Sequence, residues 1–149
     1  MAELTGIESK LFTARDFRLE SGQTLPVLEL AYEAYGTLSP TRDNAILAVH
    51  GYTSSHHAAG RNAPGKQGRG VAEGAPGWFD GLIGPGKAVD TNRYFVVSVN
   101  ALGSAHGSTG PNATDPRTGT TPRANGTRTE NRRRYSICRC PRSPVLPPG

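Results

Sequence analysis

The sequence has few of the residues from which a large hydrophobic core is built. Hydrophobic residues make up 35% of the 149 residues, with one Trp and one Met, whereas Gly (19) and Pro (12) are abundant. The only two cysteines, Cys138 and Cys140, form a C-x-C near the C-terminus. This pair supplies too few ligands for a four-ligand zinc site, and its spacing is poor for a structural disulfide. We therefore expect no metal site and no disulfide framework.

Signals for targeting or membrane insertion are also lacking. The first ten residues, MAELTGIESK, have neither the basic start nor the apolar run of a signal peptide. No run approaches the ~18 apolar residues that a membrane helix needs. The sequence predicts a cytoplasmic protein with no membrane partner.

Charge is distributed unevenly along the chain. Residues 123–149 contain seven Arg and one Glu, a net charge of +6, whereas residues 1–122 contain ten basic and eleven acidic groups. The basic segment is also rich in Pro and has no apolar periodicity, which is typical of disorder. We therefore predict two parts, a folded part at 1–121 and a disordered Arg/Pro-rich tail at 122–149.

The folded part reads mainly as strands. Residues 10–38 alternate roughly between apolar and polar side chains and break at SGQ, which predicts two extended segments joined by a turn. The apolar runs at 45–52 and 93–102 predict two strands buried on both faces of a parallel or mixed sheet. The patch WFDGLIGPG predicts one helical turn. Both buried strands lead into Gly-rich loops, and such loops build the active site of an open α/β sheet.

Several longer segments carry a resemblance to a known family. LAYEAYGTLSP, NAILAVHGYTSSHHAAG, GWFDGLIGPGKAVDTNRYFVVSVNALGSAHGSTGP and DPRTGT follow one another along the chain. In order and spacing they resemble the N-terminal part of the homoserine O-acetyltransferase family, which has the α/β-hydrolase fold. The resemblance covers residues 5–121. It implies an α/β fold class in which this chain forms the N-terminal, mostly stranded part of an α/β-hydrolase sheet that is incomplete.

The resemblance also implies a chemistry and a site. Family members transfer an acyl group through a serine nucleophile, with acetyl-CoA as co-substrate and no bound cofactor. The partners are then a small-molecule acyl donor and an acceptor, which is homoserine, serine or water. The backbone amide of Tyr52 is implied as an oxyanion-hole donor, and His50, Gly51 and Thr53 as the substrate-side loop around it. A tight turn at a strand end can aim such amides at one point, and each is worth about 3 kcal/mol of the barrier.

The serine nucleophile itself has no match in these residues. Its motif, Gly-x-Ser-x-Gly, does not occur in the sequence. Ser104 and Ser108 lie in Gly/Ser loops with the wrong spacing, so we predict turn roles for them. We also predict structural rather than catalytic roles for the histidines, which are His50, His56, His57 and His106. The sequence therefore predicts a chain truncated before the nucleophile, with a frameshifted tail, and inactive by itself.

An alternative hypothesis is a small basic protein that binds nucleic acid through its Arg-rich tail. The net charge of +6 over residues 123–149 favours it. Against it, Tyr135 is the only aromatic residue in the tail, and no known binding module is present. We therefore expect no specific nucleic-acid partner.

Overall fold

The computed structural model describes residues 3–5, 7–51, 53–61, 74–104, 106–110, 113–114 and 119. These residues form six β-strands and no helix. The predicted tail at 122–149 lies outside the described residues. The strands are β1 (Lys10–Arg18), β2 (Thr24–Tyr35), β3 (Ala45–Val49), β4 (Ile83–Gly84), β5 (Val89–Asp90) and β6 (Phe95–Val99).

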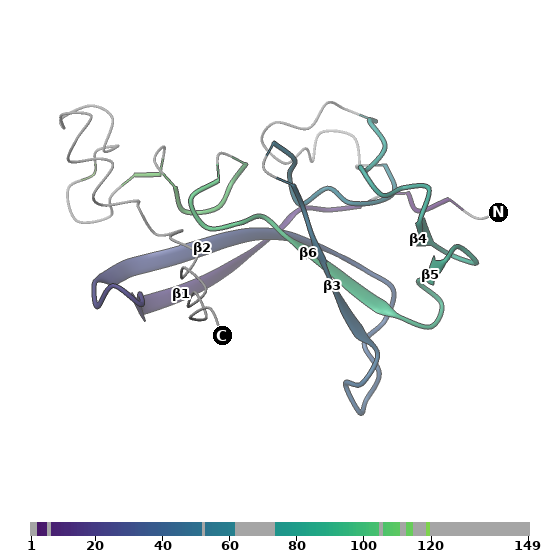
Figure 1. The fold of residues 1–149 in the computed structure, drawn as a ribbon, viewed down its shortest axis with the longest axis horizontal. Coiled ribbons are helices and arrows are strands. Elements are labelled where there is room, and N and C mark those ends of the chain that lie inside the picture. The colour runs from purple at the N-terminus through teal and green to yellow at the C-terminus, as the bar shows by residue number, and fades with distance from the viewer. Residues whose placement is uncertain are drawn as a thin grey trace, which may run out of the picture.

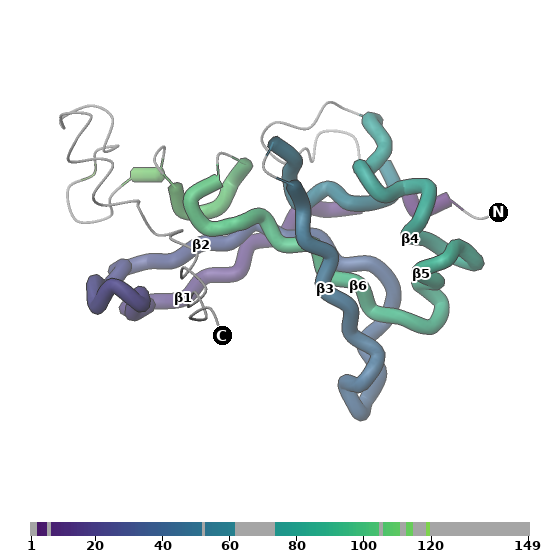
Figure 2. Tube along the Cα trace, viewed as in Figure 1, coloured from purple at the N-terminus to yellow at the C-terminus, as the bar shows by residue number. Residues whose placement is uncertain are grey.

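Four of the strands form one mixed sheet in the order β1-β2-β6-β3 (Figure 1). β1 and β2 are an antiparallel hairpin, and β2 pairs antiparallel with β6. β3 pairs parallel with β6, from Ala45 opposite Phe95 to Val49 opposite Val99. A parallel pair needs a crossover connection, and here residues 50–94 supply it. That crossover carries the short parallel pair of β4 and β5 (Figure 2).

The predicted strands are confirmed, with differences at their ends and edges. The expected segments 45–52 and 93–102 shorten to β3 and β6. The prediction that both are buried on both faces is wrong for β3, because Leu47 is 64% and Val49 73% exposed. β3 is the outer strand of the sheet among the described residues, so apolar character alone does not bury it. The predicted helical turn at WFDGLIGPG is a series of turns, with one helix-like bond from the Ile83 amide to the Phe79 carbonyl.

One face of the sheet closes over the core. Alternate residues of β2, β3 and β6 point to this face and pack against the crossover, as the period of two requires. Gly77 allows a close approach here, since a Cβ on it would lie 2.2 Å from the carbonyl carbon of Ala58. The buried hydrophobic core consists of Tyr35, Ala48, Ala58, Ala59, Ile83 and Val96.

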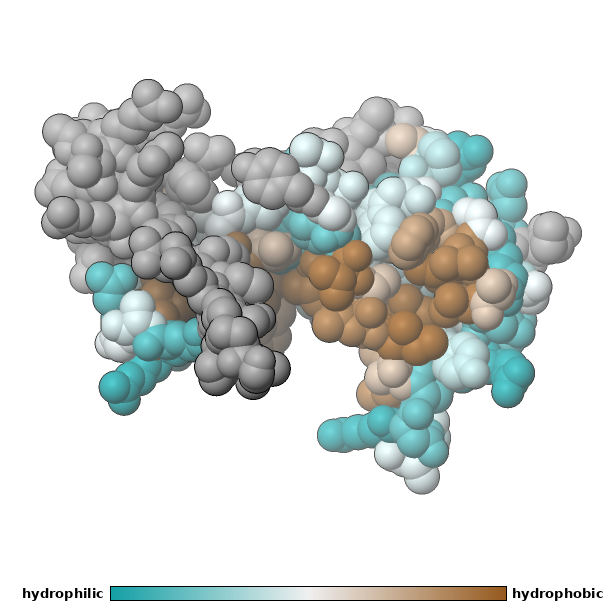
Figure 3. All heavy atoms as spheres, in the orientation of Figure 1, coloured by the Kyte–Doolittle hydropathy of each residue, from teal (hydrophilic) through white to brown (hydrophobic). Residues whose placement is uncertain are grey.

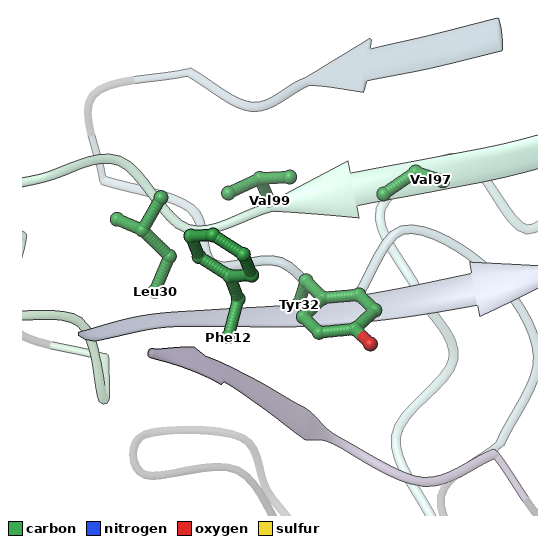
Figure 4. Close-up of a pocket in the computed structure, with 5 residues that line it drawn as sticks. All are labelled: Phe12, Leu30, Tyr32, Val97 and Val99. Carbon is green, nitrogen blue, oxygen red and sulfur yellow. The ribbon is translucent and has the colours of Figure 1, made fainter. Parts of the chain in front are cut away.

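The opposite face of the sheet is apolar and open. Five side chains from β1, β2 and β6 line a hollow of about 260 Å³ on it, namely Phe12, Leu30, Tyr32, Val97 and Val99 (Figure 4). Leu47 and Val49 lie beside Val97 and Val99 in the register and extend the same face. In Figure 3, hydrophobic residues gather over β3 and β6. Within the described residues, no helix is long and apolar enough to cross a membrane.

Candidate active site

The parallel strands β3 and β6 end side by side, and His50 joins their ends. Its Nε2 accepts a hydrogen bond of 3.1 Å from the Ala101 amide, just after β6. Its Nδ1 lies 2.7 Å from the Gly51 carbonyl oxygen. An amide can only donate and a carbonyl can only accept, so the proton of this ring sits on Nδ1. His50 therefore holds the two loops that leave the carboxyl ends of β3 and β6.

The first of these loops contains the predicted oxyanion-side residues. The Ser54 amide donates to the Gly51 carbonyl over 3.1 Å, which closes a turn. Gly51 and Thr53 are exposed there, and Tyr52 lies outside the described residues. A Cβ on Gly51 would meet nothing within 4 Å, and its φ is not positive. Nothing in the described chain therefore requires glycine at position 51.

The second loop, residues 100–110, is attached to β2 by hydroxyl groups. The Ala31 amide donates to Ser108 Oγ over 3.0 Å, and the Glu29 amide donates to Thr109 Oγ1 over 2.8 Å. Backbone bonds accompany them, from the Asn100 amide to the Ala31 carbonyl and from the Thr109 amide to the Glu29 carbonyl. Side chains thus continue the pairing of β2 where β6 ends.

The two loop serines are occupied by these structural bonds. Ser108 Oγ also accepts from Asn100 Nδ2 and donates to the Asn100 carbonyl over 2.7 Å, so its one donor and two acceptor sites are all used. Ser104 donates to Asn100 Oδ1 over 3.0 Å. This arrangement gives both serines a scaffolding role.

A buried polar network follows the first loop. Tyr35 Oη donates to Glu33 Oε2 over 2.6 Å and accepts from the amides of Ala58 and Ala59. Glu33 Oε2 also lies 2.9 Å from His57 Nδ1. Glu33, Tyr35 and His57 are each at most 3% exposed. Burial and the nearby Glu33 carboxylate together raise the pKa of Tyr35, so its hydroxyl stays protonated.

The contacts of His57 fix its charge. Its Nδ1 faces the Glu33 carboxylate, and its Nε2 lies 3.0 Å from the Ala75 carbonyl oxygen. Both partners accept, so both ring nitrogens carry a proton and His57 is an imidazolium. Burial alone lowers the pKa of His57, but the hydrogen bond and the charge of Glu33, with the Ala75 carbonyl, outweigh it and raise the pKa. The ion pair is therefore buried and fully hydrogen-bonded.

The neighbouring His56 differs from His57 in its environment. Its Nε2 lies 2.6 Å from Ser9 Oγ, and its Nδ1 has no partner among the described residues. Burial lowers the pKa of His56, more than the nearby Glu33 charge raises it. The two adjacent histidines point to different partners, and no group of three or more His, Cys, Asp or Glu in the described residues could hold a metal. His106 is half-buried in the second loop.

Sequence reasoning missed Glu33 and Tyr35. A signal was present in LAYEAYG, where Glu33 occupies the same strand face as Ala31 and Tyr35, both of them buried. A carboxylate on the core face of a strand indicates a buried cationic partner.

The comparisons with known proteins find related sequences but no matching family model. Over 114 residues the chain is 48% identical to a homoserine O-acetyltransferase from Deferribacter desulfuricans, and this match covers 76% of the chain and 28% of the relative. Over 110 residues the chain is 47% identical to a homoserine O-succinyltransferase from Hydrogenovibrio crunogenus, and this match covers 74% of the chain and 26% of the relative. The chain thus spans less than a third of the length of these relatives.

Solved structures agree with the sequence matches. A homoserine O-acetyltransferase from Bacillus anthracis superposes with a TM-score of 0.66 at 35% identity, over 80% of this chain and 31% of that one. The esterase E22 superposes with the same TM-score and identity, over 78% of this chain and 31% of that one. These findings confirm the predicted resemblance and the fold. The chain is homologous to homoserine O-acyltransferases over its N-terminal three quarters, and its strands form part of an α/β-hydrolase sheet.

Proposed function

We propose that this homologue of the homoserine O-acyltransferases supplies the oxyanion side of a serine acyl-transfer site. The first loop, at residues 50–53, provides the donor, which is the backbone amide of Tyr52 by resemblance. The second loop, at residues 100–110, forms the adjoining wall. The acyl donor is an acyl-CoA thioester or an ester, and the acceptor is homoserine or water.

The observation that carries the proposal is the His50 bridge. By bonding to Gly51 and Ala101, His50 holds the loop after β3 beside the end of β6. The carboxyl ends of parallel strands are where α/β sheets bind ligands. The α/β-hydrolase fold takes one oxyanion donor from the loop after this strand.

Gly51 adds support to this proposal. Neither a positive φ nor lack of space for a Cβ explains the glycine. Close approach of a ligand to the backbone is a further reason for glycine, and an acyl group held by the next amide would make that approach.

Relatives differ in the acceptor that their names state. Homoserine is named in the acyltransferases, whereas E22 is an esterase, which uses water. By resemblance, the loop sequence His-Gly-Tyr-Thr-Ser is closer to the hydrolase-like members of the family than to the homoserine enzymes, which usually carry His-Ala-Leu-Thr-Gly there. This difference favours ester hydrolysis, with homoserine transfer as the second candidate.

The test places residues 1–110 of this chain in the homoserine O-acetyltransferase of Deferribacter desulfuricans, in exchange for its matching segment. The chimera is assayed with p-nitrophenyl acetate alone and with acetyl-CoA plus homoserine. We expect ester hydrolysis that exceeds homoserine transfer. The 149-residue chain alone contains no Gly-x-Ser-x-Gly, so we expect it to give no turnover.

Two substitutions at Tyr52 test the amide directly. Tyr52→Pro removes the N–H, and we expect kcat to fall by about 10²–10³, the usual cost of one oxyanion donor. Tyr52→Ala keeps the N–H and is the matched control, with a change in kcat of less than about tenfold expected on the same scale. Equal losses in both variants would refute the role of the amide.

The nucleic-acid alternative is not proposed. It rests on residues 122–149, outside the described part of the chain. The relatives and structures reported above are acyltransferases and an esterase, and none of them supports it.

A further inference from the structure

We propose that Glu33 and His57 form a charged latch that positions the loop after β3, and that the latch opens when His57 loses its proton. The proposal rests on the acyl-transfer function above. It assigns Glu33 and His57 as positioning residues, since neither is placed to touch an acyl group.

The latch requires a proton on each ring nitrogen of His57. Glu33 Oε2 receives hydrogen bonds from Tyr35 and His57, and its Oε1 lies 3.2 Å from the same His57 Nδ1. A neutral His57 has one N–H, so either its bond to Glu33 or its bond to the Ala75 carbonyl is lost on deprotonation. Loss of the bond to Glu33 leaves the buried carboxylate with the Tyr35 hydroxyl as its remaining donor, and such loss of a hydrogen bond to a buried charge is costly.

Contacts within the crossover lead from the latch to the oxyanion-side loop. The His57 amide donates to Ser55 Oγ over 3.3 Å, and the Ser55 carbonyl accepts from Trp78 Nε1 over 2.9 Å. Ser54, the next residue, closes the turn onto Gly51. A shift of His57 away from Glu33 is therefore expected to move the turn that Ser54 closes onto Gly51.

Other ionisable groups face His57 from the elements around it. Glu33 and Tyr35 come from β2, and His56 is its neighbour in the chain. Asp80, in the turn after Gly77, adds a favourable negative charge. Asp80 is in turn bound by the Gly60 amide and lies 3.7 Å from Lys87 Nζ. Tyr35 and His56 stay neutral near pH 7, so Glu33 is the group that compensates the imidazolium.

The direction of the pH effect follows from the raised pKa of His57. A group whose pKa is higher in the folded state contributes stability that is fully present below its unfolded value, about 6.5 for His. That contribution is lost as the pH rises through the folded-state pKa. The latch is therefore closed below about pH 6.5 and opens as the pH rises through the folded-state pKa of His57, which lies above that value.

The test is NMR on the full 149-residue chain between pH 5.5 and pH 9.5. We expect His57 to show two protonated ring nitrogens at pH 6 and to titrate above 6.5. Hydrogen exchange at the Ala58 and Ala59 amides reports the closed latch. We expect their protection factors to fall about 10- to 100-fold across this titration, the effect of losing a hydrogen bond to a charged group.

Two variants separate the charge from the fold. In Glu33→Gln, the amide oxygen can still accept from Tyr35 and the NH₂ can donate to a neutral His57, so protection is expected not to change with pH. Ser98→Ala is the matched control, because Ser98 lies opposite Glu33 and its buried hydroxyl has no partner among the described residues. We expect the Ala58 and Ala59 amides of Ser98→Ala to lose protection with rising pH as they do in the wild-type chain.

Three results would overturn the latch. The first is a His57 ring that carries a single proton at pH 6. The second is a fall in Ala58 and Ala59 amide protection with pH that persists in Glu33→Gln. The third is protection of these amides in the wild-type chain that does not follow the His57 titration. The first result needs no variant, so a variant that fails to fold does not remove the test.

The chimera described above connects the latch to turnover. If the chimera is active, we expect its kcat to fall as the pH rises through the His57 titration, while KM stays within about twofold. We expect Glu33→Gln to abolish this fall of kcat with pH. If the chimera is inactive while the amides follow His57, the acyl-transfer proposal fails and the latch geometry stands.

Discussion

Replacing Tyr35 by Phe tests how strongly the buried network stabilises the fold. The substitution removes one oxygen that makes three hydrogen bonds, one donated to Glu33 and two accepted from the amides of Ala58 and Ala59. The lost bond to a carboxylate costs about 1.5–3 kcal/mol, and each amide left unsatisfied costs about 1–3 kcal/mol. Partial relaxation makes the sum an upper bound, so we expect a loss of about 3–5 kcal/mol.

Such a loss is large for a domain of ordinary stability, about 5–15 kcal/mol. The assay is urea unfolding followed by fluorescence of Trp78, the only tryptophan, whose Nε1 donates to Ser55 beside the network. Tyr32→Phe is the control on the same strand, because the Tyr32 hydroxyl makes no hydrogen bond among the described residues and faces the open side. A Tyr35→Phe value within 0.5 kcal/mol of this control, the usual range of neutral surface changes, would refute the reasoning.

Two further predictions concern close packing and the open face. Gly77→Ala places a Cβ 2.2 Å from the Ala59 amide nitrogen, so we expect the free energy of unfolding to fall by more than about 2 kcal/mol, on the scale of other steric core changes. Gly81→Ala is the control in the same urea assay, because a Cβ at position 81 would meet nothing within 4 Å. The double substitution Leu47→Ser and Val49→Thr removes apolar surface from the exposed side of β3. We therefore expect sedimentation velocity to show less self-association, with little change in the free energy of unfolding. Unchanged self-association would exclude this face as its cause.

The strands were predictable because their signal is local. Alternation in residues 10–35 reflects an antiparallel hairpin whose second strand buries one face, and it needs no knowledge of distant contacts. The apolar runs of β3 and β6 likewise predicted extended structure. Their places in the sheet were not predictable, because exposure of Leu47 depends on which strands lie beside β3 and not on its own residues.

The loops were predicted as loops, but their organisation was not. Ser108 was expected to have an ordinary turn role, yet Ser108 and its neighbour Thr109 accept hydrogen bonds from backbone amides of β2 that lie 77 and 80 residues earlier. Glu33 was not singled out from the sequence, although its partner His57 was considered as a candidate residue. Both misses have the same physical cause, since the pairing of polar groups far apart in sequence is set by tertiary contacts.

Both loops at the candidate site are held by one strand, β2. Residues 29–31 pair with the loop after β6 through Ser108 and Thr109, and residues 33–35 hold the segment after β3 through His57. The described residues of the two loops form no helix or strand, so their buried amides need partners from elsewhere, and β2 provides them. The positions of the two loops are therefore both set by β2. A change in the register of β2 would displace both walls of the site together, whereas loss of Glu33 would displace only the oxyanion side.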